Sequence, residues 1–408
     1  MIRISSQQIF SGGINRLQEL NTTLNNTQQQ ISTGKRVNTP SDDPVAAARI
    51  LKLDQELSRV ETYQRNVNLA NNRLSQEESA LESATDIIQR VRELTVQAGN
   101  GSLSANDRRS ISSELQERLG QLANVANTRD ASGEYIFSGF QGSKQAFVKD
   151  AAGSWIYQGD EGQRVLEIDD GVTVPISDHG KSIFVNVPRE VTGVENPANS
   201  PGSYISGVEL TDTDALQAAF GGAVPNDIRL TVNPAGEVIA ENTNTVPATV
   251  LTTSPSPALV GEPFEVAGIQ ATISDAVAGD EFTLAIKDKQ SVFATIENLI
   301  AGLDSLGKNS AKSSAQYDTL IADSLANLDN AQESIVLKQT ELGGRMNAVE
   351  STQQFLEDSS VYANEIRSEL QDVDYAEAIS NLSFQSFVLQ AAQQSFAQVS
   401  QLSLFDRL

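Results

Sequence analysis

Apolar residues recur at every seventh position over long stretches of both halves of the chain, and this period constrains the fold most. In the C-terminal half the stripe consists of Ile321, Leu328, Ile335, Leu342, Val349, Leu356, Ala363 and Leu370. In the N-terminal half it consists of Leu53, Val60, Val67, Leu74, Leu81 and Ile88. Such stripes are typical of long helices packed lengthwise. Polar residues at the second stripe position (Lys338, Arg345, Thr352) favour a multi-helix rod over a two-stranded zipper.

Proline and glycine separate these helical flanks from the middle of the chain. Ten of the 12 prolines lie between Pro175 and Pro263, and residues 45–130 and 264–408 contain none. Because proline interrupts helices, the sequence predicts a mainly α fold with a β-rich insert. The N- and C-terminal segments are expected to form a long antiparallel helical bundle or coiled-coil rod. A shorter helix is expected between the two long ones, with Ser104 and Asp107 as a capping box.

The middle of the chain has the pattern of short strands and turns. Residues 154–158 and 164–168 flank a turn at 159–162, which predicts a hairpin, and residues 228–232 and 237–239 flank another turn at 233–236. Further strands are expected at 264–266, 271–273 and 282–286. Residues 141–290 carry 21 acidic and 8 basic side chains. Such a surface is solvated, so we expect it to face outward.

These patterns together predict five segments. Residues 1–42 and 371–408 are terminal assembly helices, expected to be poorly ordered in the free monomer. Residues 43–140 and 289–370 are the two parts of the helical rod, and residues 141–288 are a variable β-rich surface domain.

The two chain ends carry apolar stripes of their own on segments with few charges. The predicted assembly interface consists of Phe10, Leu17, Leu20, Leu24 and Ile31 at one end and of Leu382, Leu389, Ala392, Phe396, Val399 and Phe405 at the other. Neutral amide and hydroxyl side chains occupy the far faces, so an isolated helix gains little from ion pairs. An ordinary intramolecular core is the alternative; we favour assembly, because both stripes are nearly uncharged and lie beyond the rod.

The composition excludes several classes of protein. The chain has no cysteine and one histidine, which leaves neither thiolate nor His-pair chemistry. A net charge of −24 argues against nucleic-acid binding. No apolar run suits a signal peptide or a membrane span, so we expect no membrane association and, if the chain is exported, a route without a cleaved leader.

No motif for catalysis or cofactor binding accompanies these patterns, and we expect no enzyme, cofactor or metal. His179 lacks a nucleophile elbow and is interpreted as a loop histidine. Asp42 and Asp43, before Pro44, are interpreted as helix capping, and residues 169–171 as a turn rather than a metal site.

Several segments resemble the flagellin superfamily of bacterial axial proteins. Residues 32–38 (STGKRVN) with 40–44 (PSDDP) resemble its N-terminal signature, and residues 342–347 (LGGRMN) and 374–382 (DYAEAISNL) resemble its C-terminal ones. Residues 132–139 (SGEYIFSG) and 402–408 (LSLFDRL) most resemble the hook-associated branch of type 3, which forms the hook–filament junction. The resemblance covers about residues 1–140 and 290–408.

The resemblance implies a structural protein of the bacterial flagellum that self-assembles into a ring between hook and filament. It implies type III export into the extracellular flagellum and a cytoplasmic export chaperone at the C-terminal segment. The implied partners are a second hook-associated junction protein on the hook side and flagellin on the distal side.

Two other functions remain open at this point. One is a flagellin that forms the filament itself. The other is an acidic cell-surface binding module, in which Trp155 and Tyr157 would stack on a ligand such as a glycan, although alternating aromatic residues in a hairpin usually belong to a core.

Overall fold

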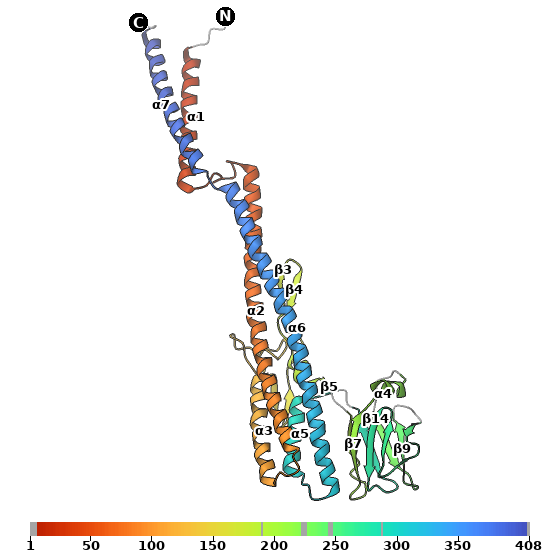
Figure 1. Ribbon diagram of the computed structural model, residues 1–408. Helices are drawn as coiled ribbons and strands as arrows, with labels where there is room; N and C mark the ends of the chain where they lie inside the picture. The colour runs from red at the N-terminus through yellow and green to blue at the C-terminus, as the bar shows by residue number, and fades with distance from the viewer. Residues whose placement is uncertain (1–5, 189–190, 222–226, 244–247, 287–288, 406–408) are drawn as a thin grey trace. The chain divides into compact units, whose positions relative to one another are not determined.

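The computed structural model describes residues 6–188, 191–221, 227–243, 248–286 and 289–405, with side chains described between residues 11 and 398 of these (Figure 1). Its helices are α1 (Ser6–Thr33), α2 (Pro44–Ala98), α3 (Ala105–Ala126), α4 (Thr213–Ala219), α5 (Val292–Ser305), α6 (Ala311–Gln371) and α7 (Tyr375–Phe405), with a π-helical turn η1 (Lys181–Val185). The chain divides into two compact units. Unit 1 contains Met1–Val67, Ile168–Asp170 and Glu350–Leu408; unit 2 contains Asn68–Glu167 and Gly171–Val349.

The heptad stripes predicted for the rod are buried. On α6, all seven stripe residues from Ile321 to Ala363 are at most 7% exposed. On α2, those from Val60 to Ile88 are at most 4% exposed. The long helices predicted from the period are therefore confirmed.

The shorter helix α3 also forms as predicted. The Ser104 side chain accepts the backbone N–H of Asp107, and the Asp107 carboxylate accepts the backbone N–H of Ser104 at 2.9 Å. Its apolar side, Ile111, Leu115, Leu119 and Leu122, is buried. α5 packs beside α3 in unit 2, so the rod has more than two helices there, as the polar stripe positions indicated (Figure 1).

Short strands make up the middle of the chain. They are β1 (Phe147–Lys149), β2 (Trp155–Tyr157), β3 (Val165–Asp169), β4 (Val172–Pro175), β5 (Val187–Pro188), β6 (Thr192–Glu195), β7 (Tyr204–Leu210), β8 (Ile228–Val232), β9 (Glu237–Asn242), β10 (Thr249–Leu251), β11 (Thr253–Ser254), β12 (Ala258–Leu259), β13 (Pro263–Val266), β14 (Ile269–Ser274), β15 (Glu281–Ala285) and β16 (Lys289–Gln290).

Two antiparallel sheets in this region share one apolar core. The first has the order β10-β9-β8-β15-β6, with β12 also paired to β9, and the second has the order β11-β13-β14-β7. Alternate residues of β8 and β14 are buried, which is the period of strands with one face on a core. The predicted hairpin across residues 233–236 is confirmed, since Val232 pairs with Val238.

The hairpin predicted across residues 159–162 is wrong. β2 pairs with β1, and β3 pairs with β4. The reason is local: the Asp150 carboxylate accepts the N–H groups of Ala152 and Ser154, each at 2.9 Å, and this turn joins β1 to β2. Asp160, in the expected turn, instead accepts the backbone N–H of Phe140 at 2.9 Å. The turn residues there anchor a loop.

Candidate assembly interface

The terminal helices α1 and α7 lie side by side in unit 1 and run antiparallel (Figure 1). The Thr27 hydroxyl donates to Oε1 of Gln385 at 3.0 Å. Nearer the chain ends, a Cβ placed on Gly13 would come within 2.7 Å of the Phe396 ring. Glycine at position 13 therefore lets α1 approach α7 closely. Rising residue numbers on α1 meet falling numbers on α7, which fixes the antiparallel direction.

The stripe residues predicted at the two ends are brought together within this helix pair. The half-buried ones are Leu17, Leu20, Leu24 and Ile31 on α1 and Leu382, Ala392 and Phe396 on α7. Leu389 is buried, with 9% exposed. The side chains of Phe10, Val399 and Phe405 lie outside the described residues. The two stripes thus cover one another in part.

A second set of apolar side chains on α7 remains open, and the heptad period did not point to it. Phe384 is 68% exposed, Phe387 is 69% exposed and Ile379 is 53% exposed. We call these three residues the outer patch of α7. They lie off the stripe that faces α1. The signal that could have revealed them is two phenylalanines off the period of a nearly uncharged helix.

Few charges accompany these apolar surfaces. α1 contains only Arg16 and Glu19 as charged residues, and α7 contains only Glu377. Removing charged groups from water is costly. Because these helices carry few charges, burying either of them among copies of itself would cost little in this respect. The pair can accept a close neighbour at low electrostatic cost.

The two chain segments that connect this pair to α2 and α6 are joined to each other. The Arg36 N–H donates to the carbonyl of Gln371 at 2.6 Å, and the Val373 N–H donates to the carbonyl of Gly34 at 3.0 Å. Gly34 has a φ of +72°, and a Cβ there would lie 3.0 Å from the Tyr375 hydroxyl, so glycine is required. We call residues 34–43 and 371–374 the joint.

The acidic pair in the joint has structural partners. Asp42 accepts the N–H groups of Thr39 at 2.8 Å and Asn38 at 3.0 Å, and these bonds lower the pKa of its carboxyl. Asp43 accepts the N–H groups of Val45 and Ala46 at the start of α2. The capping predicted for this pair is confirmed at Asp43.

The other polar candidates are also held by local bonds. His179 Nδ1 accepts the N–H of Ser182 at 3.2 Å. Asp170 and Gly171 (φ +72°) form the turn between β3, which ends at Asp169, and β4, so the predicted turn is confirmed. No group of three or more His, Asp or Glu side chains within the described ranges is placed to hold a metal ion. Of the helices described, none is long and apolar enough to cross a bilayer.

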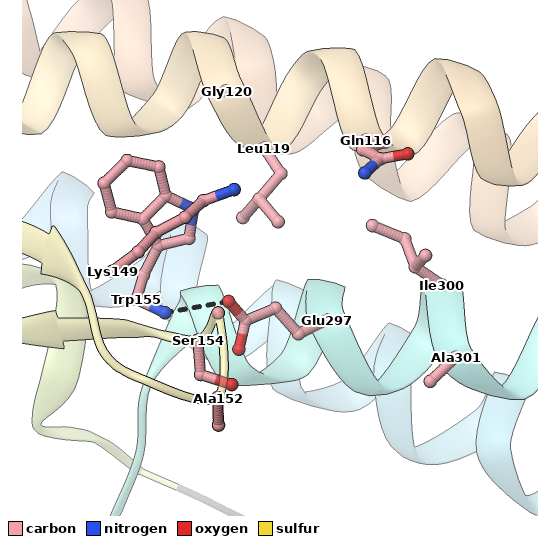
Figure 2. Close-up of a pocket in the computed structure, with 11 residues that line it drawn as sticks. Gln116, Leu119, Gly120, Lys149, Ala152, Ser154, Trp155, Glu297, Ile300 and Ala301 are labelled. Atoms are coloured by element: carbon pink, nitrogen blue, oxygen red, sulfur yellow. Dashed lines mark hydrogen bonds between the residues drawn. The ribbon is translucent and has the colours of Figure 1, made fainter.

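A shallow hollow of about 240 Å³ lies between α3, α5 and the β1–β2 turn (Figure 2). Trp155 lines it. The backbone N–H of Trp155 donates to the Glu297 carboxylate at 2.9 Å, and Lys149 Nζ lies 5.3 Å from the centroid of the Trp155 ring. Tyr157 instead contacts Phe147, with ring centroids 5.3 Å apart. The Phe293 ring centroid lies 6.1 Å from that of Trp155 and 4.7 Å from that of Phe147. The two aromatic residues considered for ligand stacking therefore contribute to one aromatic cluster within the chain, as alternating aromatic residues in a hairpin usually do.

The comparison with protein families matches both chain ends. Residues 4–142 match the bacterial flagellin N-terminal helical region, and residues 325–408 match the bacterial flagellin C-terminal helical region.

Curated relatives extend this similarity. Flagellar hook-associated protein 3 of Escherichia coli K12 is 24% identical over 99% of both chains. Its counterpart in Salmonella typhimurium is 34% identical over 46% of this chain, a match that spans 58% of the relative. The chain is also 30% identical to a flagellin of Listeria monocytogenes, over 28% of its length.

Solved structures share the fold. The flagellar junction protein FlgL from Legionella pneumophila is 27% identical, with a TM-score of 0.63 over 79% of this chain and all of that one. FlgL from Xanthomonas campestris is 25% identical, with a TM-score of 0.65 over 78% of this chain and 99% of that one.

Proposed function

The chain belongs to the flagellin family, whose N- and C-terminal helical regions together match more than half of it, and we propose that it is a structural, non-enzymatic protein of the hook–filament junction. The observation that carries the proposal is the similarity to the hook-associated protein of Escherichia coli along 99% of the chain, against 28% of it for the Listeria monocytogenes flagellin. This extent favours the junction over the filament itself.

The assembly contacts are proposed to come from the terminal helix pair. The stripe residues hold α1 to α7, and the outer patch of α7, with Phe384 and Phe387, packs against neighbouring copies in a ring. Full burial of a phenylalanine side chain contributes roughly 1.5–3 kcal/mol, so two per subunit supply a substantial driving force. The small number of charges on α1 and α7 supports the same role.

The remaining parts of the proposal follow from family membership. Residues 1–42 and 371–408 act as assembly segments that order fully only in the ring, residues 43–140 and 289–370 form the rod, and residues 141–288 form the surface domain. Flagellin on the distal side and a second hook-associated protein on the hook side are the proposed neighbours. Type III export to the extracellular flagellum, with a chaperone on the C-terminal segment, is proposed for delivery.

Deletion of the gene from its native bacterium tests the function. We expect electron microscopy to show hooks without filaments, and we expect flagellin to accumulate in the medium. Filaments of normal number and length on the deletion strain would contradict the proposal and would favour a surface-binding role.

Leu389→Asp tests the helix pair in that function. A carboxylate in place of a buried leucine should separate α1 from α7 and abolish assembly, while the rod and the β region stay folded. Gln390→Asp, at the exposed neighbouring position, is the matched control and should assemble. A Leu389→Asp strain that swims and keeps its filaments would contradict this assignment.

A further inference from the structure

A buried carboxyl group on α2 has no evident role in assembly. Glu77 is 2% exposed, and its Oε1 has no hydrogen-bond partner among the described residues. A fully buried carboxylate without a compensating partner is costly, and such groups usually bind a proton instead. The surroundings of Glu77 decide whether it keeps that proton.

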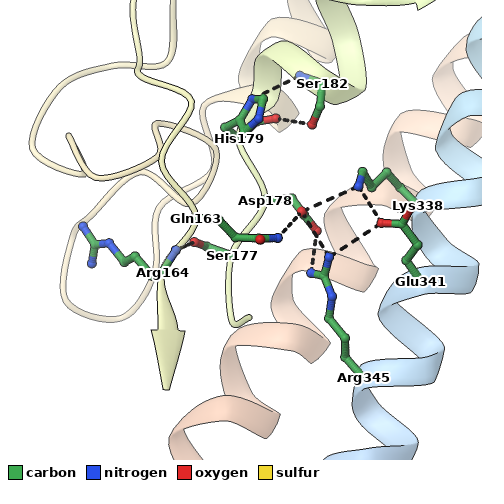
Figure 3. Close-up of polar contacts among 9 residues, drawn as sticks. All are labelled: Gln163, Arg164, Ser177, Asp178, His179, Ser182, Lys338, Glu341 and Arg345. Atoms are coloured by element: carbon green, nitrogen blue, oxygen red, sulfur yellow. Dashed lines mark hydrogen bonds and ion pairs between the residues drawn. The ribbon is translucent and has the colours of Figure 1, made fainter. Parts of the chain in front are cut away.

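An acidic neighbour of Glu77, Asp178, already pairs with two basic side chains. The Arg345 guanidinium of α6 forms two hydrogen bonds to its carboxylate, at 2.7 and 3.3 Å, and Lys338 Nζ lies 3.7 Å away (Figure 3). Gln163 donates to the same carboxylate at 2.9 Å. Glu341 pairs with Lys338 at 2.5 Å and with Arg345 at 3.6 Å. Asp178 is therefore held ionised, and its pKa is lowered.

The charged groups on the other side of Glu77 are also paired. A cavity of about 20 Å³ is lined by Glu77 and by two arginines. Arg73 lies 3.2 Å from Asp130 and 3.5 Å from Glu134, and Arg164 lies 2.5 Å from Glu134. These arginines are engaged with other carboxylates. Each of these four basic side chains, Arg345, Lys338, Arg73 and Arg164, thus has an acidic partner other than Glu77.

We propose that Glu77 carries a proton at neutral pH, donates it in a hydrogen bond to the Asp178 carboxylate, and makes unit 2 sensitive to alkaline pH. The proton lets two acidic side chains share one buried site. When it is lost, two carboxylates face each other and the packing of α2 against the segment around Asp178 weakens.

The electrostatics of the site agree with this geometry. Burial raises the pKa of Glu77 to about 8. The charge and the side-chain hydrogen bond of Asp178 act in the same direction, whereas Arg345 and the backbone hydrogen bond from Asp178 act against it. An acid whose folded-state pKa is raised binds more protons in the folded than in the unfolded state. Its contribution to stability is therefore present below the ordinary pKa of 4.5, decreases as pH rises towards about 8, and is constant above that.

Glu77→Gln tests the proposal, because glutamine imitates the protonated acid. Thermal unfolding is followed from about pH 5 to pH 9 by the fluorescence of Trp155, the one tryptophan of the chain, which lies in the same unit. We expect the variant to unfold several degrees higher than the wild type near pH 9 and at nearly the same temperature near pH 5. The control is Glu82→Gln, at an exposed position of α2, and it should follow the wild type. A Glu77→Gln curve parallel to the wild type would overturn the proposal.

Infrared spectra of the wild-type protein give a second test that needs no variant to fold. The carbonyl band of a protonated carboxylic acid should be present near pH 6.5 and absent near pH 9.5. A spectrum without that band at the lower pH would equally overturn the proposal. Both tests use the free chain, so their failure would leave the junction function untouched.

Discussion

The rod helix α6 and the terminal pair α1–α7 are built on the same seven-residue period but differ in how completely they bury it. On α6, stripe residues such as Leu328 and Val349 are fully buried. On α1, Leu17 and Leu24 are only half-buried, and on α7 the outer patch is open to solvent. The rod has further helices to close its core, whereas α1 has α7. An identical period therefore indicates helices but not how many partners complete them.

The largest effect is expected at the outer patch of α7, which is exposed in the single chain. The double variant Phe384→Ser, Phe387→Ser should abolish assembly, because both rings are exposed in the single chain and are proposed to be buried in the ring. Its effect on monomer stability should stay within about 0.5 kcal/mol, as for other surface changes. Sedimentation and filament counts by electron microscopy measure assembly, and denaturant unfolding measures the stability of the monomer. Gln393→Ser is the control on the same helix, and assembly by the double variant would refute the role of the outer patch.

Replacing a stripe leucine by alanine measures how much its burial contributes to stability in the rod and in the terminal pair. Leu328→Ala should cost about 2–5 kcal/mol, the usual range for a cavity in a well-packed core. Leu24→Ala should cost about 1 kcal/mol or less, because the side chain already contacts water. Urea unfolding followed by circular dichroism gives both values. Equal costs would show that the terminal pair is as closed as the rod.

Removal of the α2 cap should have a smaller effect. Asp43→Ala leaves the N–H groups of Val45 and Ala46 without their carboxylate partner. The expected loss is about 1 kcal/mol. Asp43→Asn, which keeps the acceptor oxygen, should restore most of it in the same unfolding experiment. Failure of asparagine to do so would mean that the charge, and not the cap, matters.

The smallest effect is expected at the exposed ion pair between α6 and α2 in unit 1. Arg367 Nη1 lies 3.3 Å from Asp54, and both side chains are substantially exposed, 38% and 50%. Arg367→Ala should cost less than about 1 kcal/mol, and less still at high salt. A larger, salt-independent loss would indicate that the guanidinium has a further role.

Much of the helical architecture was predictable from the sequence because helix signals are local and repeated. The period located the buried stripes from Val60 to Ile88 and from Ile321 to Ala363, and Ser104 with Asp107 located the start of α3. The sequence also shows an apolar stripe at each end of the chain. Their contact with each other, rather than with other copies alone, depends on the antiparallel return of the chain, which the period does not specify.

The remaining features depend on contacts between distant residues. The turn signal at 159–162 was real, but Asp160 uses its carboxylate to hold Phe140, so no hairpin forms there. The polar residues Lys338 and Arg345 at stripe positions do not suit a two-stranded zipper. Their partner Asp178 comes from a segment more than 150 residues earlier, and no local pattern indicates it. Glu77 was missed because one acid on a long helix has no distinguishing pattern.

Hydrogen–deuterium exchange of the free monomer, read by mass spectrometry, tests the central comparison most directly. We expect strong protection of amides along residues 328–356 of α6 and much faster exchange along α1 and α7, because neighbouring copies are proposed to complete the core of the α1–α7 pair. Slow exchange of α1 and α7 in the isolated chain, equal to that of α6, would contradict this expectation.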